Sequence, residues 1–327
     1  MKLESIGFYT LSDDRARNAS ATSPMWRCEL IVTDRCNFHC TYCRGLDKEL
    51  RGDLDAAKAL KTLDLWCKDG LKHVRFSGGE PTLYPDLGVL IAAVRPTVKR
   101  VALSTNGSAT RDRYDYLLEE GVDDFSVSLD ACCSSFADKM AGCDCNFDKV
   151  CANIRFLAAR AYTTVGVVLN EQNVDELKRI VEFADGLGVA DIRVIPAAQY
   201  SKALASVDLP PALLDKHPIL RYRINAAKNG ESVRGLGPED PNRCYLVRDD
   251  SAVAGENHFP CIIYLREGGK PIGKVSSQMR EERVEWVRTH DIQADPICRG
   301  NCLDVCRDYL RKAELFAGPG SKTATVD

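Results

Sequence analysis

The sequence has no apolar run approaching the roughly 18 residues that a helix needs to cross a bilayer. It also has little net charge, because 44 lysines and arginines stand against 47 aspartates and glutamates. That balance gives no electrostatic reason to expect binding to nucleic acid or to an anionic membrane. Residues 1–20 lack the basic and then apolar order of a secretory signal. We therefore expect a cytoplasmic protein without membrane contacts.

Cysteine is the residue type present in unusual number, with 15 among 327 residues. This share is below the roughly 8–10% of short disulfide scaffolds. Thiols stay reduced in the cytosol, so cysteines that cluster in the sequence indicate metal ligands or catalytic groups. The remaining composition, 45% apolar and 28% charged, is that of an ordinary globular protein. The length is sufficient for two domains.

Short apolar segments alternate with helical patterns from residue 26 to about residue 230. The apolar segments show little polar alternation, which is typical of parallel strands covered on both faces. Six such β-then-α units predict an α/β fold with right-handed crossovers, and they are too few for an eight-stranded barrel. We therefore expect a partial (βα)6 TIM-like barrel. The expected strands are 26–33, 73–77, 100–104, 124–128, 163–169 and 191–195, and the expected helices begin near 55, 85, 111, 147, 174 and 211.

Glycines and prolines gather at residues 235–241 and predict a boundary. Beyond it, residues 244–310 have the pattern of a hairpin followed by a helix. The final residues are expected to be frayed. The predicted divisions are an N-terminal segment at 1–25, the barrel at 26–232, a small hairpin-plus-helix extension at 233–316 and a tail at 317–327.

Three cysteines, Cys36, Cys40 and Cys43, follow the first expected strand directly, in CNFHCTYC. Ligand sites of parallel α/β folds lie on the loops at the carboxyl ends of the strands. Thiolates at such a place are ligands for iron–sulfur clusters or zinc. Three of them leave one coordination position open, as catalytic metal sites require. The alternative is a zinc site whose fourth ligand lies far away in the sequence. The one histidine near the three cysteines is His39.

The C-x3-C-x-Tyr-C pattern resembles the signature of radical S-adenosylmethionine (SAM) enzymes. Further motifs in the order typical of that family follow at the ends of successive strands, and the likeness covers about residues 26–200. These motifs are Ser77–Pro81 after the second strand, Ser104–Gly107 after the third, Ser126–Asp130 at the fourth and Val194–Pro196 at the sixth.

The resemblance implies that the three cysteines hold a [4Fe–4S] cluster whose unligated iron chelates SAM. It also implies an electron donor such as flavodoxin or ferredoxin, reductive cleavage of SAM to a 5′-deoxyadenosyl radical, and removal of a hydrogen atom from the substrate. The residues implied to bind SAM are Tyr42, Gly78, Gly79, Glu80, Ser104, Asn106, Ser128 and Ile195.

These residue types also have physical interpretations of their own. Gly78 and Gly79 would let the backbone approach a ligand closely, and the Glu80 carboxylate would accept a hydrogen bond from an ammonium group. The alternative for Glu80 is an acid at a helix N-terminus beside Pro81. The short polar residues at the strand ends equally suit turn capping.

A second group of cysteines lies in the C-terminal region. Its layout resembles the twitch or shortened SPASM extension of radical SAM enzymes, which implies an auxiliary [4Fe–4S] cluster. Structural zinc is the alternative. Five thiols for four positions leave the ligand set open, and Cys244, if free, would be a hydrogen-atom donor to a substrate radical. The five are Cys244, Cys261, Cys298, Cys302 and Cys306.

The remaining cysteines are predicted to be mainly structural. Cys28, Cys67 and Cys151 suit small core positions. A third cluster, or a hydrogen donor, is the alternative for those that follow the fourth strand. These are Cys132, Cys133, Cys143 and Cys145.

The expected function is that of a radical SAM enzyme acting on a sugar, aminoglycoside or nucleoside, with dehydrogenation or epimerisation as the outcome. About 25 residues precede the first strand, so we expect no leader-peptide-binding domain. A peptide maturase or epimerase is an alternative, and a non-catalytic cluster-binding or zinc-binding protein is one of another class. Molybdenum-cofactor cyclases fit less well, because their auxiliary cysteine spacing and basic tail are absent. Candidate substrate contacts are Lys72, Arg75, Arg193 and Gln199.

Overall fold

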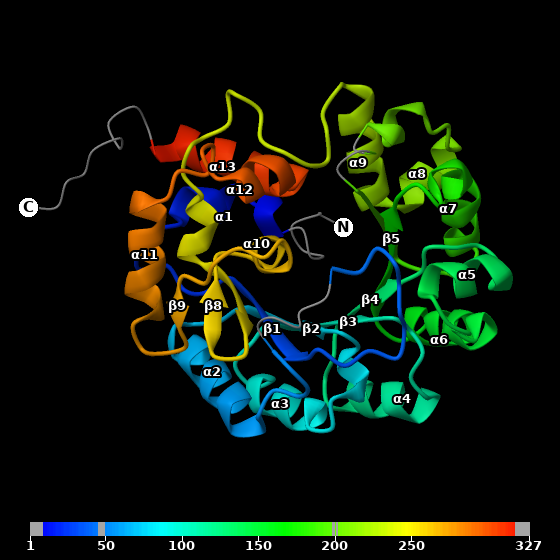
Figure 1. Cartoon of the computed structure of the whole chain (residues 1–327), viewed down its shortest axis with the longest axis horizontal. Coiled ribbons are helices and arrows are strands. Elements are labelled where there is room, and N and C mark those ends of the chain that lie inside the picture. The colour runs from blue at the N-terminus through cyan, green and yellow to red at the C-terminus, as the bar shows by residue number, and fades with distance from the viewer. Residues whose placement is uncertain (1–8, 45–49, 198–199, 201, 318–327) are drawn as a thin grey trace, which may run out of the picture.

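A computed structural model describes residues 9–44, 50–197, 200 and 202–317 (Figure 1). Six parallel strands form the barrel wall in the order β6-β5-β4-β3-β2-β1. They begin and end within one residue of the predicted segments, and most of their side chains are buried, as continuous apolar runs require. The strands are β1 (Arg27–Thr33), β2 (His73–Gly78), β3 (Arg100–Thr105), β4 (Asp124–Ser128), β5 (Tyr162–Leu169) and β6 (Asp191–Pro196).

The helices that connect these strands pack on the outside of the sheet (Figure 1). Helix α2 begins where predicted, because the Asp55 side chain accepts a hydrogen bond of 3.0 Å from the backbone N–H of Lys58. Helix α5 was not predicted from the sequence. The helices are α2 (Ala56–Lys68), α3 (Leu87–Val94), α4 (Arg111–Glu119), α5 (Ser134–Ala141), α6 (Phe147–Ala158) and α7 (Leu177–Asp185), with short 3-10 turns at Pro81–Leu83 and Val174–Glu176.

The helix predicted to begin near residue 211 is two helices, α8 (Pro211–Lys216) and α9 (Pro218–Lys228). Pro218 has no backbone N–H to donate, and its ring disfavours a helical conformation at His217. His217 accordingly has φ −117° and ψ 82° and ends the first helix. A 3-10 turn at Ala203–Ser206 precedes this pair.

The C-terminal hairpin extends the barrel sheet. Strand β7 (Asp250–Ala254) pairs in parallel with β1, with Arg27 opposite Asp250 and Ile31 opposite Ala254. Strands β8 (Asn257–Phe259) and β9 (Gly273–Lys274) then add antiparallel pairs and complete a nine-stranded sheet. The hairpin prediction is confirmed, but its first strand begins at Asp250, after a 3-10 turn at Tyr245–Arg248. One sheet thus joins the two predicted parts of the chain.

The C-terminal helices form a second layer beside β7, together with the described part of the N-terminal segment (Figure 1). Helix α1 (Asp13–Asn18) packs on α13, and a small apolar core lies between them. Its buried members are Ala16, Leu246, Ile292, Tyr309, Leu310 and Ala313. The helices are α10 (Ile262–Arg266), α11 (Met279–Thr289), α12 (Pro296–Asn301) and α13 (Asp304–Ala317), and a 3-10 turn at Tyr9–Leu11 precedes α1. The predicted tail beyond residue 317 lies outside the described residues.

Among the described residues, no helix combines the length and the apolar character that spanning a membrane requires.

Two buried ion pairs connect the C-terminal layer to the rest of the protein. Arg15 of α1 donates to both carboxylate oxygens of Asp249, at 2.5 and 3.1 Å. Arg223 of α9 donates to both carboxylate oxygens of Asp304, each at 3.1 Å, and to the carbonyl of Val194 in β6 at 2.7 Å. Each guanidinium binds its carboxylate bidentately, which is the geometry that best offsets the cost of burying both charges.

The Arg223 pair yields a prediction with a control on the same helix. Arg223→Met leaves the Asp304 carboxylate buried without its cation, so we expect a loss of about 3–5 kcal/mol in the free energy of unfolding. Arg221→Met removes an exposed ion pair with Asp215 and should cost less than about 1 kcal/mol. Urea unfolding of the anaerobically purified protein, followed by circular dichroism, measures both. Equal losses in the two variants would show that the buried pair does not hold α9 to α13.

Candidate functional site

A pocket of about 440 Å³ opens at the carboxyl ends of the barrel strands. Its lining comes from the ends of β2, β3, β4 and β6 and from the loop that follows β1. Each residue that the sequence predicted to hold the first cluster or SAM lines this pocket, except Glu80. The residues brought together are Cys36, Cys40, Tyr42, Cys43, Gly78, Gly79, Ser104, Asn106, Ser128 and Ile195.

The loop that carries the first three cysteines is held on both sides. The backbone N–H of His39 donates to the carbonyl of Ala141 at 2.7 Å, so the end of α5 supports the loop. Gly142, with φ +67°, completes this contact, because a Cβ there would lie 2.4 Å from the His39 carbonyl oxygen. The helix that sequence reasoning missed therefore supports the cysteine loop.

Of the cysteines on this loop, Cys40 is half-buried, and Cys36 and Cys43 are exposed. Burial raises the pKa of Cys40 to about 11, although a hydrogen bond with Tyr42 opposes that shift. Burial likewise raises the pKa of Cys36, whose sulfur accepts hydrogen bonds from the Phe38 N–H at 3.4 Å and from the Asn106 amide at 3.9 Å. Raised values mean that binding of a metal releases protons at neutral pH, so loading of this site is favoured as pH rises.

The two glycines of the turn after β2 are required by the loop itself. A Cβ on Gly78 would lie 2.2 Å from the Thr33 carbonyl oxygen, and one on Gly79 would lie 2.3 Å from that of Arg35. The N–H of Gly79 donates to the Thr33 carbonyl at 2.8 Å, and the N–H of Glu80 donates to the Arg35 carbonyl at 2.8 Å. We predicted that these glycines allow close approach of a ligand, and the structure adds close approach of the segment just before Cys36.

The Glu80 side chain is fully buried and lies outside the pocket lining. One carboxylate oxygen accepts from the Thr82 N–H, the Thr82 hydroxyl and the Thr105 hydroxyl, at 3.0, 2.6 and 2.8 Å. The other accepts from the Asn106 N–H at 2.6 Å. Glu80 thus ties the end of β2 to the end of β3 and caps the turn that begins at Pro81, in line with the structural alternative. Its contact with an ammonium group stays a prediction.

Asp130, the last residue of the motif at β4, is a pocket residue that sequence reasoning quoted but assigned no role. It accepts hydrogen bonds from the Tyr42 hydroxyl and, at 2.6 Å, from the Val168 N–H. Burial raises the pKa of Asp130 to about 6, and the Tyr42 hydrogen bond opposes that shift. The contact fixes Tyr42, and with it the loop between Cys40 and Cys43, against the end of β4.

Three arginines line the pocket that the sequence analysis did not single out: Arg44, Arg234 and Arg266. We call them the arginine cluster. Motif reasoning had no signal for Arg234 or Arg266, because both reach the pocket from the C-terminal layer. The substrate contacts predicted from strand positions do not reach the lining, since Lys72 precedes β2 and Arg75 and Arg193 lie inside their strands. Gln199 lies outside the described residues.

The five C-terminal cysteines come together in the C-terminal layer. Burial raises the pKa of Cys244, and the nearby thiols of Cys298, Cys261 and Cys306 raise it further. A hydrogen bond between Cys302 and Cys306 raises the pKa of Cys302 and lowers that of Cys306. None of the five lines the pocket. Cys244 thus lies among possible metal ligands, and its role as a hydrogen donor stays a prediction without support from the pocket geometry.

The spacing of the cysteines bears on the zinc alternatives. Sulfurs around a tetrahedral zinc would lie about 3.8 Å apart, because Zn–S bonds are about 2.3 Å. Within the described ranges, one set of three ligand atoms lies mutually within 4.8 Å, and it comes from His290, Asp295 and Cys298. No three cysteine sulfurs of either group satisfy that limit in the described part of the chain. In the described residues, the zinc alternative therefore has no preformed set of three thiols.

The other predicted core cysteines are partly confirmed. Cys28 and Cys151 are buried in the main core, and Cys67 is half-buried against it. Cys145, for which a third cluster or hydrogen donation was the alternative to a structural role, is buried and lines the pocket.

Comparison with known proteins agrees with the site. Residues 30–184 match the model of the Radical SAM superfamily. A protein named probable GTP 3′,8-cyclase from Metallosphaera sedula is 29% identical over 177 residues, which is 53% of this chain and 56% of that protein. GTP 3′,8-cyclase 1 of Mycobacterium tuberculosis is 31% identical over 179 residues, or 51% and 49% of the two chains. The chain thus spans about half the length of the curated relatives it matches.

Among solved structures, anSMEcpe with bound AdoMet and the Cp18Cys peptide matches with a TM-score of 0.58 at 14% identity, over 90% of this chain and 97% of that one. SuiB of Streptococcus suis bound to the precursor peptide SuiA matches with a TM-score of 0.59 at 15% identity, over 87% and 67% of the two chains. At these identities the likeness is one of fold, and it confirms the partial TIM-like barrel.

Radical SAM proteins use a [4Fe–4S] cluster and SAM. The pocket fits both, since three cysteine sulfurs face a cavity that is also lined by short polar side chains from the strand ends. The family match, the order of the motifs and this geometry lead to one conclusion: residues 30–184 of the chain match the Radical SAM superfamily, and the barrel that they form continues through β6.

Proposed function

We propose that this chain is an enzyme that cleaves SAM reductively and removes a hydrogen atom from a small polar substrate. The observation that carries the proposal is the gathering of the three loop cysteines with the predicted SAM contacts around one pocket. When bound, the cluster and SAM supply a 5′-deoxyadenosyl radical. A redox partner such as flavodoxin or ferredoxin would deliver the electron.

The residues of the chain orient the reactants and keep water away. Ser104, Asn106 and Ser128 present short polar groups at neighbouring strand ends, which suit ribose hydroxyls or a carboxylate. The Asn106 amide is oriented by a hydrogen bond of 2.9 Å to the Asn37 side chain. Apolar side chains, among them Leu129 and Met140, cover the same pocket and shield a reactive intermediate from solvent.

A second candidate is a nucleotide substrate. The curated relatives are named GTP 3′,8-cyclase, and the pocket carries three arginines that a neutral sugar would not require. From the cysteine spacing and the absence of a basic tail, we expected molybdenum-cofactor cyclases to fit less well. The similarity of about half of this chain to the GTP 3′,8-cyclases favours a nucleotide substrate more than that spacing did. Dehydrogenation and epimerisation remain alternative outcomes for a substrate radical in either case.

We also propose that the C-terminal cysteine group holds an auxiliary [4Fe–4S] cluster. Its five thiols come from three different parts of the layer: before the 3-10 turn at Tyr245, before α10, and along α12 and α13. Their burial and their mutual electrostatic effects support a shared ligand set that includes Cys244.

The first test replaces a loop cysteine. Cys36→Ala should abolish formation of 5′-deoxyadenosine from SAM and dithionite, because the cluster loses one of its three thiolates. Bound iron should fall by about four per chain while the auxiliary cluster remains. Cys67→Ala on α2, outside both cysteine groups, is the matched control and should retain full activity. Unchanged 5′-deoxyadenosine formation in Cys36→Ala would reject the proposed function, as would reconstitution with zinc in place of iron.

The second test asks whether Cys244 is a ligand or a free thiol. If it binds the auxiliary cluster, Cys244→Ala should lower bound iron from about eight to about four per chain and leave cleavage of SAM in place. Cys133→Ala, at an exposed position before α5, serves as control. Iron and sulfide quantitation after anaerobic reconstitution is the measurement. Full iron content in Cys244→Ala would instead support the free thiol predicted as a hydrogen donor.

A further inference from the structure

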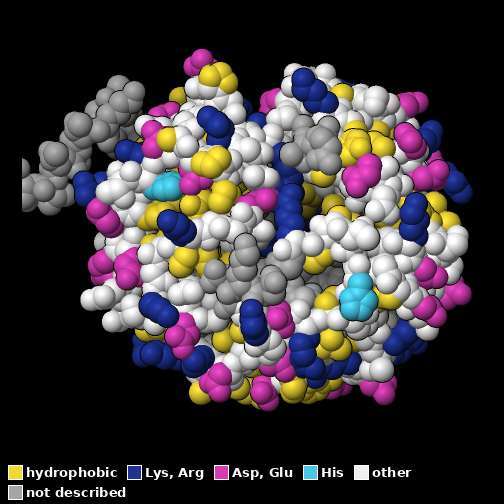
Figure 2. Space-filling view, in the orientation of Figure 1, with side chains coloured by type: hydrophobic (Ala, Val, Ile, Leu, Met, Phe, Trp, Pro, Cys, Tyr) yellow, Lys and Arg dark blue, Asp and Glu magenta, His cyan; other side chains and the backbone are white. Residues whose placement is uncertain are grey.

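The arginine cluster brings three cations from separate segments to one pocket. Arg44 follows the cysteine loop directly, Arg234 lies between α9 and the 3-10 turn at Tyr245, and Arg266 ends α10. Figure 2 shows basic side chains in the hollow at the centre of this face, between the barrel and the C-terminal layer. Exposed arginines on a surface need no explanation, but three that share one cavity raise the question of what neutralises them.

The described acidic groups near the pocket do not neutralise the cluster. Arg44 forms an ion pair with Glu267. Arg266 donates to the carbonyl of Gly78 at 3.3 Å and to the Ser77 hydroxyl at 3.4 Å, both of which are uncharged. Asp130, the one acidic residue that the described part of the chain contributes to the lining, is already bound by Tyr42 and Val168. Among the described residues, at least one positive charge is therefore left over beside a partly apolar cavity.

Arg234 is the least satisfied member. Its Nε donates to the Pro196 carbonyl at 2.8 Å, while its Nη1 is buried and has no hydrogen-bond partner within the described ranges. Burial, together with the charges of Arg44 and Arg223, lowers the pKa of Arg234 to about 10. A buried donor without an acceptor costs free energy that a bound anion would recover.

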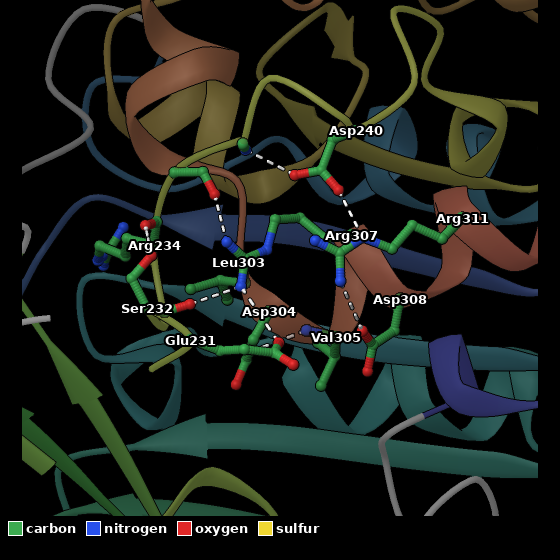
Figure 3. Close-up of polar contacts among 12 residues, drawn as sticks. Glu231, Ser232, Arg234, Asp240, Leu303, Asp304, Val305, Arg307, Asp308 and Arg311 are labelled. Atoms are coloured by element: carbon green, nitrogen blue, oxygen red, sulfur yellow. Dashed lines mark hydrogen bonds and ion pairs between the residues drawn. The ribbon is translucent and has the colours of Figure 1, made fainter. Parts of the chain in front are cut away.

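The backbone around Arg234 is fixed by the C-terminal layer (Figure 3). Arg307 of α13 donates to the carbonyls of Ser232 and Gly235, at 2.6 and 2.8 Å, on either side of Arg234. The N–H of Gly235 also donates to the Cys302 carbonyl at 2.9 Å. In Figure 3 the Arg234 side chain points away from Arg307. Such a guanidinium is held in place before a ligand arrives, which reduces the entropy lost on binding.

We propose that Arg44, Arg234 and Arg266 recognise an anionic group of the substrate, a phosphate or a carboxylate. This inference rests on the proposed function, because it assigns the substrate class of the same pocket. Guanidinium groups suit both anions, since their planar donors match pairs of oxygen atoms. Arg266 lies against the Gly78 turn, which the family resemblance assigns to SAM, whereas Arg234 lies at the end of β6 and in the C-terminal layer. Arg234 is therefore the residue that separates a substrate site from the carboxylate of SAM.

The test measures binding of inorganic pyrophosphate and of malonate to the anaerobically reconstituted protein by calorimetry, with SAM present. We expect one of the two probes to bind, which identifies the anion as phosphate or carboxylate. Arg234→Gln should weaken that binding at least about tenfold, and Arg234→Lys should weaken it less. SAM affinity should stay within about twofold of wild type in both variants. Arg221→Gln, an exposed arginine of α9, is the control and should change neither.

Several results would overturn the inference. The first is that neither pyrophosphate nor malonate binds to the wild-type protein. The second is that Arg234→Gln binds the probe as tightly as wild type does. The third is that Arg234→Gln loses affinity for SAM, which would assign the arginine to SAM. Arg266→Gln provides a second variant that should also weaken probe binding if Arg234→Gln does not fold.

Formation of 5′-deoxyadenosine is measured on the same preparations. If it is absent while binding of the probe depends on Arg234, the radical SAM proposal fails and the anion site stands. If it is present while the probe does not bind, the anion site alone fails.

Discussion

The parallel pairing of β7 with β1 is the constraint on which the two halves of this protein depend. Strand β1 carries the cysteine loop at its carboxyl end and has β2 on its other side. The antiparallel strand β8 follows β7, and α10 comes next and packs on both strands. Arg266, at the end of α10, then reaches the carbonyl of Gly78. One set of backbone hydrogen bonds therefore places the C-terminal layer beside the pocket.

Buried charge reinforces that pairing at the other end of the strands. Asp249 and Asp250 stand at the start of β7 and receive Arg15 from α1 and Arg27 from β1. Each carboxylate is buried and would destabilise the fold without its guanidinium. The N-terminal segment thus contributes to the placement of β7, although the sequence analysis treated it as a separate stretch before the barrel.

The parts of the fold that could be predicted are those specified by local pattern. Continuous apolar runs identified the barrel strands, and a capping aspartate, either Asp53 or Asp55, indicated the start of α2, because each signal lies within a few neighbouring residues. The parallel partner of β7 could not be inferred, since β1 lies more than 200 residues away and any apolar strand would serve as its neighbour. Glu80 shows the same limit within the site, because its hydrogen bonds to Thr105 and Asn106 depend on how β2 and β3 align.

The division between what motifs predict and what topology supplies also separates the predicted cofactor contacts from the proposed anion site. The cysteine loop, the glycine turn and the strand-end polar residues lie within residues 30–184, the part that matches the family. Arg234 and Arg266 reach the pocket from outside that part, and the contacts of α13 hold Arg234 in place. A barrel that keeps its cofactor-binding residues constant and receives its substrate-binding residues from a separate layer can change its substrate. The ligands of its cluster are then left undisturbed.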